Sequence, residues 1–356
     1  MKVTVVTVVF NAAALLEPTL QSVAAQSHDD IEYLVIDGGS TDGTLDIVER
    51  YRHALTRCLS EPDNGIYDAM NKAVALAEGE WIIFMNAGDR FYDDTTVERV
   101  LAAAPADAEI LYGDTCFYSE TGKEELIAPL PVESLWQYMV FNHNSSFSRT
   151  ALLKAHPFNP CYRVVADAEF FLHCYKEGRR FHYLEFPVNY YLRDGFSDQH
   201  AVFRLVERWK LVYESKLAPP EAVNAHYFER IRRTFQHGAS TPVDGLRTTH
   251  SLAAFEAAVA RVAAAHERFI LYGGGTAGHL IAALVPTQIA AVIDRHPERS
   301  KIDRTAVLLP EALETLEPLP VLITVLGREQ EIAGELSERF GVAAGRILVL
   351  ELGDAR

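Results

Sequence analysis

The stretch Trp81-Ile-Ile-Phe-Met-Asn-Ala-Gly-Asp89 decides the fold of this chain. Its first five residues, Trp81 to Met85, are apolar and predict a buried strand, which Asn86 follows. A carboxylate just past such a strand lies at the carboxyl edge of a sheet, where open α/β folds bind ligands. Gly88 allows a tight turn and a close approach of a ligand. Asp89 would suit Mg²⁺ or Mn²⁺ as an oxygen ligand. The alternative is a β-turn in which Asp89 only caps the next helix.

Strands and helices alternate before this stretch. Apolar runs predict strands, and apolar residues at helical spacing predict the helices between them, over residues 3–10, 15–24, 31–36, 44–51 and 69–77. This alternation implies an α/β fold with a parallel sheet and helices on both faces.

Four carboxylates gather at the predicted edge of this sheet. Asp37 ends the second strand, Asp63 and Asp68 lie in the following loop, and Asp89 ends the next strand. Like charges at one site raise one another's energy unless a cation or a donor-rich ligand binds between them. A nucleotide diphosphate with its metal ion fits that requirement.

Composition excludes several classes of protein. The chain has 356 residues, 49% of them hydrophobic, which suggests two domains. The net charge of −16 argues against a nucleic-acid partner. The four cysteines lack metal or redox spacing, and we expect a reducing compartment. With neither a signal peptide nor an apolar run of membrane length, the predicted location is the cytoplasm.

Residues 199–237 differ from the rest of the chain. Seven basic residues stand there against four acidic ones, with aromatic residues such as Trp209 and Tyr227 between them. Such a segment suits peripheral contact with an anionic surface at the inner face of the cell membrane. The alternative is an ordinary amphipathic helical hairpin packed on its domain.

A second α/β unit follows a linker. We expect a first domain over 1–237, whose helical extension begins at about 199, then a linker and helix over 238–266, and a small Rossmann-like domain over 267–356. Gly273, Gly275 and Gly278 form G-x-G-x-x-G after a strand, with Asp294 near the expected distance. The glycines either bind a nucleotide phosphate or only allow tight packing of strand and helix.

Five segments of the first domain, in order, resemble the family 2 glycosyltransferases, which have the GT-A nucleotide-diphospho-sugar transferase fold. The branch that builds bacterial exopolysaccharide and lipopolysaccharide units is the most similar. The segments are Thr7-Val-Val-Phe-Asn11, Val35-Ile-Asp-Gly-Gly-Ser-Thr-Asp-Gly-Thr44, Asn64-Gly-Ile-Tyr-Asp-Ala-Met-Asn-Lys72, Phe84-Met-Asn-Ala-Gly-Asp89 and Val164-Val-Ala-Asp-Ala-Glu-Phe-Phe-Leu172.

The resemblance implies a donor pocket. Asp37 would bind the base of the donor, and the backbone near Phe10 and Asn11 would line the pocket. The remaining donor-site residues are Asp63, Asp68, Lys72 beside the diphosphate, Asn86, and Arg193 with Ser197 on a closing loop.

The resemblance also implies a divalent cation, Mg²⁺ or Mn²⁺. Asn86 and Asp89 stand where the family has an Asp-x-Asp or Asp-Asp metal motif. Because Asn86 replaces the first Asp and Gly88 an often acidic position, Asp89 would supply the carboxylate almost alone.

For the chemistry, Asp167 matches the catalytic Asp of the family. It would take the proton of the acceptor hydroxyl as that oxygen attacks the anomeric carbon, which inverts the anomeric centre. Glu169 is the second candidate base, and the two carboxylates share a face only if this segment is extended. Asp167 as a helix N-cap is the alternative. His143 would face the acceptor or the diphosphate, or else serve the structure only.

The predicted function is therefore an inverting glycosyltransferase of cell-surface polysaccharide biosynthesis. Its partners would be a nucleotide-diphospho-sugar donor, with UDP favoured over GDP, and a saccharide or lipid-linked acceptor. An NAD-dependent sugar-modifying oxidoreductase, suggested by the second glycine turn, and a non-catalytic scaffold of a polysaccharide assembly complex are the alternatives.

Overall fold

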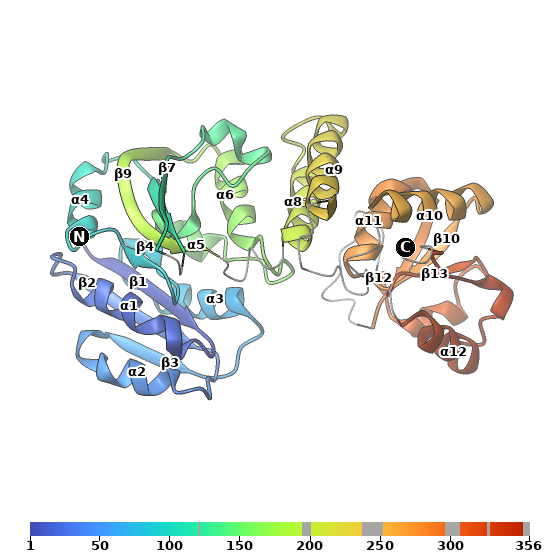
Figure 1. Ribbon diagram of the computed structural model, residues 1–356, viewed down its shortest axis with the longest axis horizontal. Coiled ribbons are helices and arrows are strands. Elements are labelled where there is room, and N and C mark those ends of the chain that lie inside the picture. Colours follow the sequence, from blue (N-terminus) through green and yellow to red (C-terminus); the bar gives the residue numbers. More distant parts are fainter. Residues whose placement is uncertain (120–121, 194–200, 237–251, 296–306, 326–327, 352–356) are drawn as a thin grey trace. The chain divides into compact units, whose positions relative to one another are not determined.

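The chain forms two compact units, residues 1–198 (unit 1) and 199–356 (unit 2) (Figure 1). The computed structural model describes residues 1–119, 122–193, 201–236, 252–295, 307–325 and 328–351. The predicted linker from 238 and Ser197 lie outside these residues. Among the described helices, none has both the length and the apolar character that crossing a bilayer requires.

A mixed sheet is the centre of unit 1. In the described part of the chain it has nine strands in the order β3-β2-β1-β4-β8-β6-β9-β5, with β7 paired to β6. The strands are β1 Val3–Val9, β2 Ile31–Asp37, β3 Arg57–Ser60, β4 Trp81–Phe84, β5 Arg90–Phe91, β6 Ile110–Tyr118, β7 Glu124–Ile127, β8 Ser146–Arg149 and β9 Phe181–Leu192.

The parallel sheet predicted from the sequence is only half of this one. β1 pairs in parallel with β2 and β4, and β2 with β3, as expected from the strand–helix alternation. Beyond β4 the order is mixed, because β8 runs antiparallel to both β4 and β6, while β6 and β9 are parallel. The expectation was wrong there because the alternation on which it rested stops at β4.

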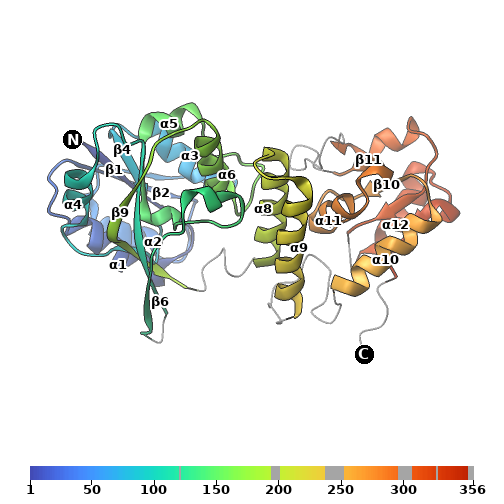
Figure 2. The same ribbon diagram turned by 90° about the horizontal axis from the view of Figure 1, so that it is seen from above.

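Helices cover both faces of this sheet. α1 and α2 bury Leu16, Leu20 and Val48 against one face, in a core shared with Val5, Tyr33 and Ile83. α3 packs on β1 and β2, and Figure 2 shows α3, α5 and α6 on the side of the sheet away from α1. The helices are α1 Ala13–Ala24, α2 Thr44–Arg50, α3 Ile66–Leu76, α4 Thr96–Ala103, α5 Thr150–Ala155 and α6 Ala166–Lys176, with 3₁₀ turns η1 Arg52–Ala54, η2 Val132–Trp136 and η3 His143–Ser145.

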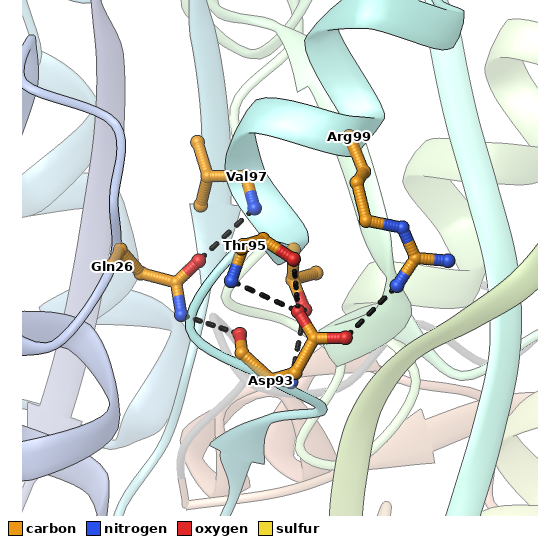
Figure 3. A network of polar contacts seen from close by, with 6 residues as sticks. Gln26, Asp93, Thr95, Val97 and Arg99 are labelled. Carbon is orange, nitrogen blue, oxygen red and sulfur yellow. Dashed lines mark hydrogen bonds and ion pairs between the residues drawn. The ribbon is translucent and has the colours of Figure 1, made fainter.

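A polar network fixes the start of α4 (Figure 3). Asp93 Oδ1 accepts hydrogen bonds from the backbone N and the hydroxyl of Thr95, and Arg99 Nη1 lies 2.9 Å from Asp93 Oδ2. Burial alone would raise the pKa of Asp93, but these donors hold it below its ordinary value of 3.8. Gln26, just beyond α1, donates to the Asp93 carbonyl and accepts from Val97 N. The network therefore ties α4 to the end of α1.

Unit 2 holds a parallel sheet in the order β12-β11-β10-β13-β14 among its described residues. In chain order this is 3-2-1-4-5, the strand order of the Rossmann fold. α12 packs on one face, while α10 and α11 lie on the other (Figure 1). The elements are α8 Ala201–Ser215, α9 Pro220–Gln236, α10 Leu252–Ala265, β10 Phe269–Tyr272, α11 Thr276–Leu284, η4 Pro286–Gln288, β11 Ile289–Ile293, β12 Val307–Leu308, η6 Pro310–Glu314, β13 Val321–Ile323, α12 Glu329–Phe340, η7 Ala344–Arg346 and β14 Ile347–Leu348.

The basic and aromatic segment forms the helical hairpin of α8 and α9. Trp209 and Tyr227 are 7% and 0% exposed, and Trp209 Nε1 donates to Asn224 at 2.8 Å. The Trp209 ring also stacks on Phe228. These side chains pack within unit 2, which is the arrangement that the hairpin alternative requires. Contact with a membrane stays a prediction.

The glycine turn of unit 2 joins β10 to α11. Gly273 has φ +118°, and a Cβ on Gly278 would lie 2.3 Å from the Gly273 carbonyl oxygen. A Cβ on Gly275 would meet nothing within 4 Å. Asp294 Oδ2 accepts from Gly274 N at 2.5 Å. Tight packing thus explains why glycine stands at positions 273 and 278, but it does not explain the glycine at position 275. Nucleotide binding by this turn stays a prediction.

Candidate active site

Phe10, Gly38 and Asp63 meet at the carboxyl ends of β1, β2 and β3. A Cβ on Gly38 would lie 2.5 Å from Asp63 Oδ2 and 3.3 Å from Phe10 Cδ2. The Phe10 ring follows a fully buried strand, yet this residue is 62% exposed. An exposed aromatic ring beside a glycine backbone and a carboxylate offers a stacking surface and hydrogen-bond acceptors, which are groups that a nucleoside needs.

Asn11 joins the loops that follow β1 and β2. Its backbone lies in the left-handed region, at φ 47°, and its Oδ1 accepts from Thr41 N at 2.9 Å. Its own N–H donates to Ser40 Oγ. Asp42, which the sequence analysis did not single out, accepts from the Thr44 hydroxyl and from Ala13 N, and these hydrogen bonds lower its pKa. The two loops therefore form one preorganised rim.

Asp37 lies beneath that rim. It is 0% exposed, and its Oδ2 accepts from the Ser60 hydroxyl at 2.6 Å and from Gly39 N at 3.1 Å. The Ser40 N–H also points to this carboxylate. In this arrangement Asp37 shapes the loop that carries Gly38, and its contact with a base stays a prediction.

The acidic loop before α3 satisfies its own charges. Asp63 Oδ1 accepts from Gly65 N at 2.8 Å, and Asp68 Oδ2 accepts from Asn64 N at 3.0 Å. Lys72 Nζ lies 2.9 Å from Glu61 Oε1 and 3.7 Å from Asp68, and the hydrogen bond to Glu61 raises its pKa. Asp63 and Asp68 therefore each have hydrogen-bond donors of their own, and the binding of one ligand by Asp37, Asp63, Asp68 and Asp89 stays a prediction.

Thr19 shapes the loop of residues 86–89. Its hydroxyl accepts from Gly88 N at 3.1 Å and donates to the Asp89 carbonyl at 2.6 Å. Gly88 has φ +98°, a conformation that strains any side chain. The Oδ1 atom of Asn86 is buried and has no hydrogen-bond partner. A buried oxygen that accepts no hydrogen bond can accept one from a ligand or coordinate a cation.

Asp89 points into unit 1. Its Oδ2 accepts from Asn144 Nδ2 and its Oδ1 from Leu192 N, at 3.2 Å for the latter. Burial raises the pKa of Asp89 to about 8, although both hydrogen bonds oppose the rise. The residue is 5% exposed. Among the described residues, no three His, Cys, Asp or Glu side chains cluster as a metal site.

His143 packs against Phe84 at the end of β4. Its ring stacks on Phe84 with 5.2 Å between the ring centroids, and its Nε2 is enclosed without a partner. Burial lowers the pKa of His143 below 6.5, while the charge of Asp167 opposes this shift. His143 is therefore neutral at neutral pH, and the charge of Asp167 acts on its buried ring.

Asp167 lies in the first turn of α6. Tyr67 OH lies 3.0 Å from its Oδ1 and 2.9 Å from the carbonyl of Val164. The helix is capped by Val165, which makes no side-chain hydrogen bond, so Asp167 is not the N-cap residue. Tyr67 lies in the first turn of α3, which follows the acidic loop with Asp63. The carboxylate predicted as base and the loop predicted for the donor are thus joined through one side chain.

Glu169 is not part of this group. Because the segment opens a helix instead of running extended, the two carboxylates diverge. Glu169 Oε1 lies 3.0 Å from His156 Nε2, and the His156 ring stacks on His173 at 3.8 Å between centroids. The structure therefore places Glu169 in a separate polar cluster on α5 and α6.

Arg193 follows the last residue of β9. Its Nη2 lies 2.5 Å from Glu125 Oε2 on β7, and its guanidinium stands over the Phe117 ring. The closing loop predicted for residues 193–197 lies mostly outside the described residues. Donor contact by Arg193 stays a prediction.

Comparison with known proteins places these residues in a family. The family model described as glycosyl transferase family 2 matches residues 4–157. A PGL/p-HBAD biosynthesis glycosyltransferase of Mycobacterium tuberculosis is 34% identical over 174 residues, which span 46% of this chain and 66% of that relative. An uncharacterized glycosyltransferase of the same species is 32% identical over 180 residues, 48% of this chain and 67% of the relative. The chain belongs to glycosyl transferase family 2.

Two further matches widen the family 2 comparison. A putative teichuronic acid biosynthesis glycosyltransferase of Bacillus subtilis is 32% identical over 123 residues, 34% of this chain and 46% of that relative. A mannosyltransferase of Pyrobaculum calidifontis, solved in complex with GDP-Man and Mn²⁺, has a TM-score of 0.50 at 19% identity and covers 80% of this chain and 79% of that one. The GT-A fold predicted from the sequence is confirmed by these matches. The chain spans just under two thirds of the PGL/p-HBAD relative.

The segment that matches the family 2 model contains only part of the candidate site. Residues 4–157 include the rim, the acidic loop, residues 86–89 and His143. Asp167, Glu169 and Arg193 lie beyond the matched segment. Two partners of the site, Tyr67 and Asn144, were missed in the sequence. Tyr67 stands inside a quoted family segment, whereas the sequence carries no signal for the contact of Asn144 with Asp89.

Proposed function

We propose that this chain is an inverting glycosyltransferase that moves a sugar from a nucleotide-diphospho-sugar to a saccharide or lipid-linked acceptor. The observation that carries the proposal is the position of Asp167, whose Oδ1 lies 3.0 Å from Tyr67 OH and whose charge acts on the buried ring of His143. A carboxylate held there is placed to act as a general base. The names of the relatives, PGL/p-HBAD and teichuronic acid biosynthesis, support an acceptor that belongs to a cell-surface glycan.

The chemistry is a single displacement. Asp167 takes the proton of the acceptor hydroxyl, whose oxygen forms a bond to the anomeric carbon. The bond from that carbon to the diphosphate breaks, and the nucleoside diphosphate leaves with the electron pair from the opposite face. Neutral His143 presents its Nε2 to the diphosphate or to the acceptor. The rim of Phe10, Asn11 and Asp63 binds the nucleoside, with a UDP-sugar as the favoured donor.

A divalent cation fits this site only in part. The orphan Oδ1 of Asn86 is the oxygen available to it, since both oxygens of Asp89 accept hydrogen bonds from Asn144 and Leu192. Asp89 would have to give up those hydrogen bonds and its proton to hold the cation as well. A cation bound by Asn86, Asp89 and the donor diphosphate would neutralise the charge that develops on the leaving group. Mn²⁺ in the mannosyltransferase complex supports this part of the proposal.

The test is release of nucleoside diphosphate from a panel of UDP- and GDP-sugars, with saccharide and lipid-linked acceptors and with or without Mg²⁺ or Mn²⁺. We expect Asp167→Asn to lower the rate roughly a hundredfold or more, because a general base contributes that much. Asp107→Asn, at an exposed acid of the same unit, is the matched control and keeps the rate.

Two outcomes contradict different parts of the proposal. An unchanged rate in Asp167→Asn would contradict the role of Asp167 as the general base. If the wild-type chain releases nothing from any donor, and no donor raises its melting temperature, the scaffold alternative replaces the enzyme. Equal rates with and without added cation, after treatment with a chelator, contradict the metal part alone.

A further inference from the structure

We propose that Tyr67 is a positioning residue that holds Asp167 in both of its protonation states. The inference rests on the proposed function, because it concerns the base of that reaction. Tyr67 is 8% exposed and lies in the first turn of α3. Its hydroxyl has two acceptors within hydrogen-bond distance, Asp167 Oδ1 at 3.0 Å and the Val164 carbonyl at 2.9 Å.

A hydroxyl between a carboxylate and a carbonyl can serve a base before and after the proton moves. A phenol donates one hydrogen and also accepts. While Asp167 is ionised, the Tyr67 hydroxyl donates its hydrogen bond to Asp167 Oδ1. Once Asp167 carries the proton of the acceptor hydroxyl on Oδ1, that O–H group donates a hydrogen bond to the Tyr67 oxygen, and the Tyr67 hydroxyl donates to the Val164 carbonyl instead. No covalent bond of Tyr67 breaks in this exchange.

The surroundings of Tyr67 fix its position. Its ring packs on Phe158, with 5.6 Å between the centroids, and Phe158 also packs on Phe84 and Phe170. Asn71 lies one turn further along α3. Its Nδ2 donates to the Phe158 carbonyl at 2.8 Å, and its Oδ1 accepts from Phe158 N at 2.9 Å. Residues four apart share one face of a helix. One face of α3 thus holds the segment that leads into α6 and its carboxylate.

Helix α3 also connects the predicted donor loop with the carboxylate that acts on the acceptor. α3 begins directly after the loop with Asp63, which lies against Gly38 on the donor rim. The same helix, through Tyr67, orients the carboxylate that acts on the acceptor. A single helix, α3, therefore follows the donor loop and contacts the base on α6, and a displacement requires such alignment of the reacting groups.

The test compares Tyr67→Phe with a matched control. Tyr183 OH donates to Asp114 Oδ1 at 2.6 Å, so Tyr183→Phe removes the same kind of hydrogen bond elsewhere in unit 1. With the fastest donor of the UDP- and GDP-sugar panel, we expect Tyr67→Phe to lower kcat roughly tenfold or more, as for loss of a hydrogen bond to a charged group. The donor KM should stay the same, because the rim is untouched. Tyr183→Phe should change neither constant.

A double-mutant cycle keeps the test independent of turnover. The free energy of unfolding is measured for Tyr67→Phe, Asp167→Asn and the double variant, and a nonzero coupling is expected because the two side chains touch. Zero coupling, or a wild-type kcat in Tyr67→Phe beside a slow Asp167→Asn, overturns the role of Tyr67. A rise in donor KM at constant kcat does so as well. A fast Asp167→Asn instead contradicts the proposed function, so the two failures are distinguishable.

Discussion

Asp89 is a carboxyl group that the fold holds in its neutral form. Burial raises its pKa from 3.8 to about 8, and Asn144 and Leu192 supply the donors that its two oxygens accept. In the unfolded chain the same group is ionised above about pH 4. Between these two values the folded state therefore binds one proton more than the unfolded state, so the stability of unit 1 decreases as pH rises.

Asp89→Asn should remove this dependence on pH. The amide carries no charge at any pH, so the free energy of unfolding of the variant, relative to wild type, should improve between about pH 5 and about pH 8. Urea unfolding at several pH values, followed by fluorescence, measures the difference. Asp107→Asn, at an exposed acid, is the control and should follow the wild type. A variant whose curve runs parallel to wild type across this range would show that Asp89 is ionised in the fold.

Asp37 and Asp89 show which site features could be predicted from the sequence. Asp37 is the last residue of a buried strand and Asp89 follows another, as the sequence pattern predicts. Asp37 Oδ2 accepts hydrogen bonds from the backbone N–H groups of Gly39 and Ser40, only two and three residues away, and a sequence pattern can indicate such local contacts. Asp89 turns inward because its donors stand 55 and 103 residues further along the chain. No local pattern contains such partners.

At the scale of elements, the start of α6 decides which of two candidate carboxylates contacts Tyr67. The sequence left Asp167 and Glu169 open, because an extended segment would place both on one face. The helix begins at Ala166 and sends Glu169 to His156, while Asp167 faces Tyr67. Mixed strand pairing beyond β4 was likewise not predicted, because a strand pattern does not specify the direction of its neighbour.

The glycine turn of unit 2 offers a test at this scale. A Cβ on Gly278 would lie 2.3 Å from the Gly273 carbonyl oxygen, which is backbone and cannot move aside easily. We expect Gly278→Ala to lower the free energy of unfolding of unit 2 by about 1–3 kcal/mol. Gly275→Ala is the matched control in the same turn, because its Cβ would meet nothing within 4 Å. Chemical denaturation of both variants gives the answer, and equal stabilities would contradict the packing explanation.

Gly275→Ala also bears on the open question of a nucleotide. A backbone that only packs tolerates the added methyl group, whereas a backbone that a phosphate approaches closely does not. Calorimetric titration with NAD therefore separates the two explanations of the turn. Binding to the wild type that Gly275→Ala abolishes supports the nucleotide, and this result would revive the oxidoreductase alternative.

At the scale of the whole molecule, the candidate site lies in residues of unit 1 alone. Every residue assigned to donor or acceptor, from Phe10 to Arg193, lies in unit 1. The core under the rim, with Val5, Tyr33 and Ile83, is also formed within that unit. The sheet of unit 2 has a core of its own, with Ile270, Ile293 and Leu336. Two such cores predict two cooperative units of folding.

A fragment of residues 1–198 should therefore fold and bind the donor. We expect the UDP- or GDP-sugar that raises the melting temperature of the full chain to raise that of the fragment equally, because ligand binding to one unit stabilises that unit by mass action. Scanning calorimetry of fragment and full chain, each with and without donor and Mn²⁺, measures the shifts. Asp167→Asn in the fragment is the control: it should keep the donor shift, since the base acts on the acceptor. A fragment that folds but shows no shift, beside a full chain that does, would mean that residues beyond 198 complete the donor site.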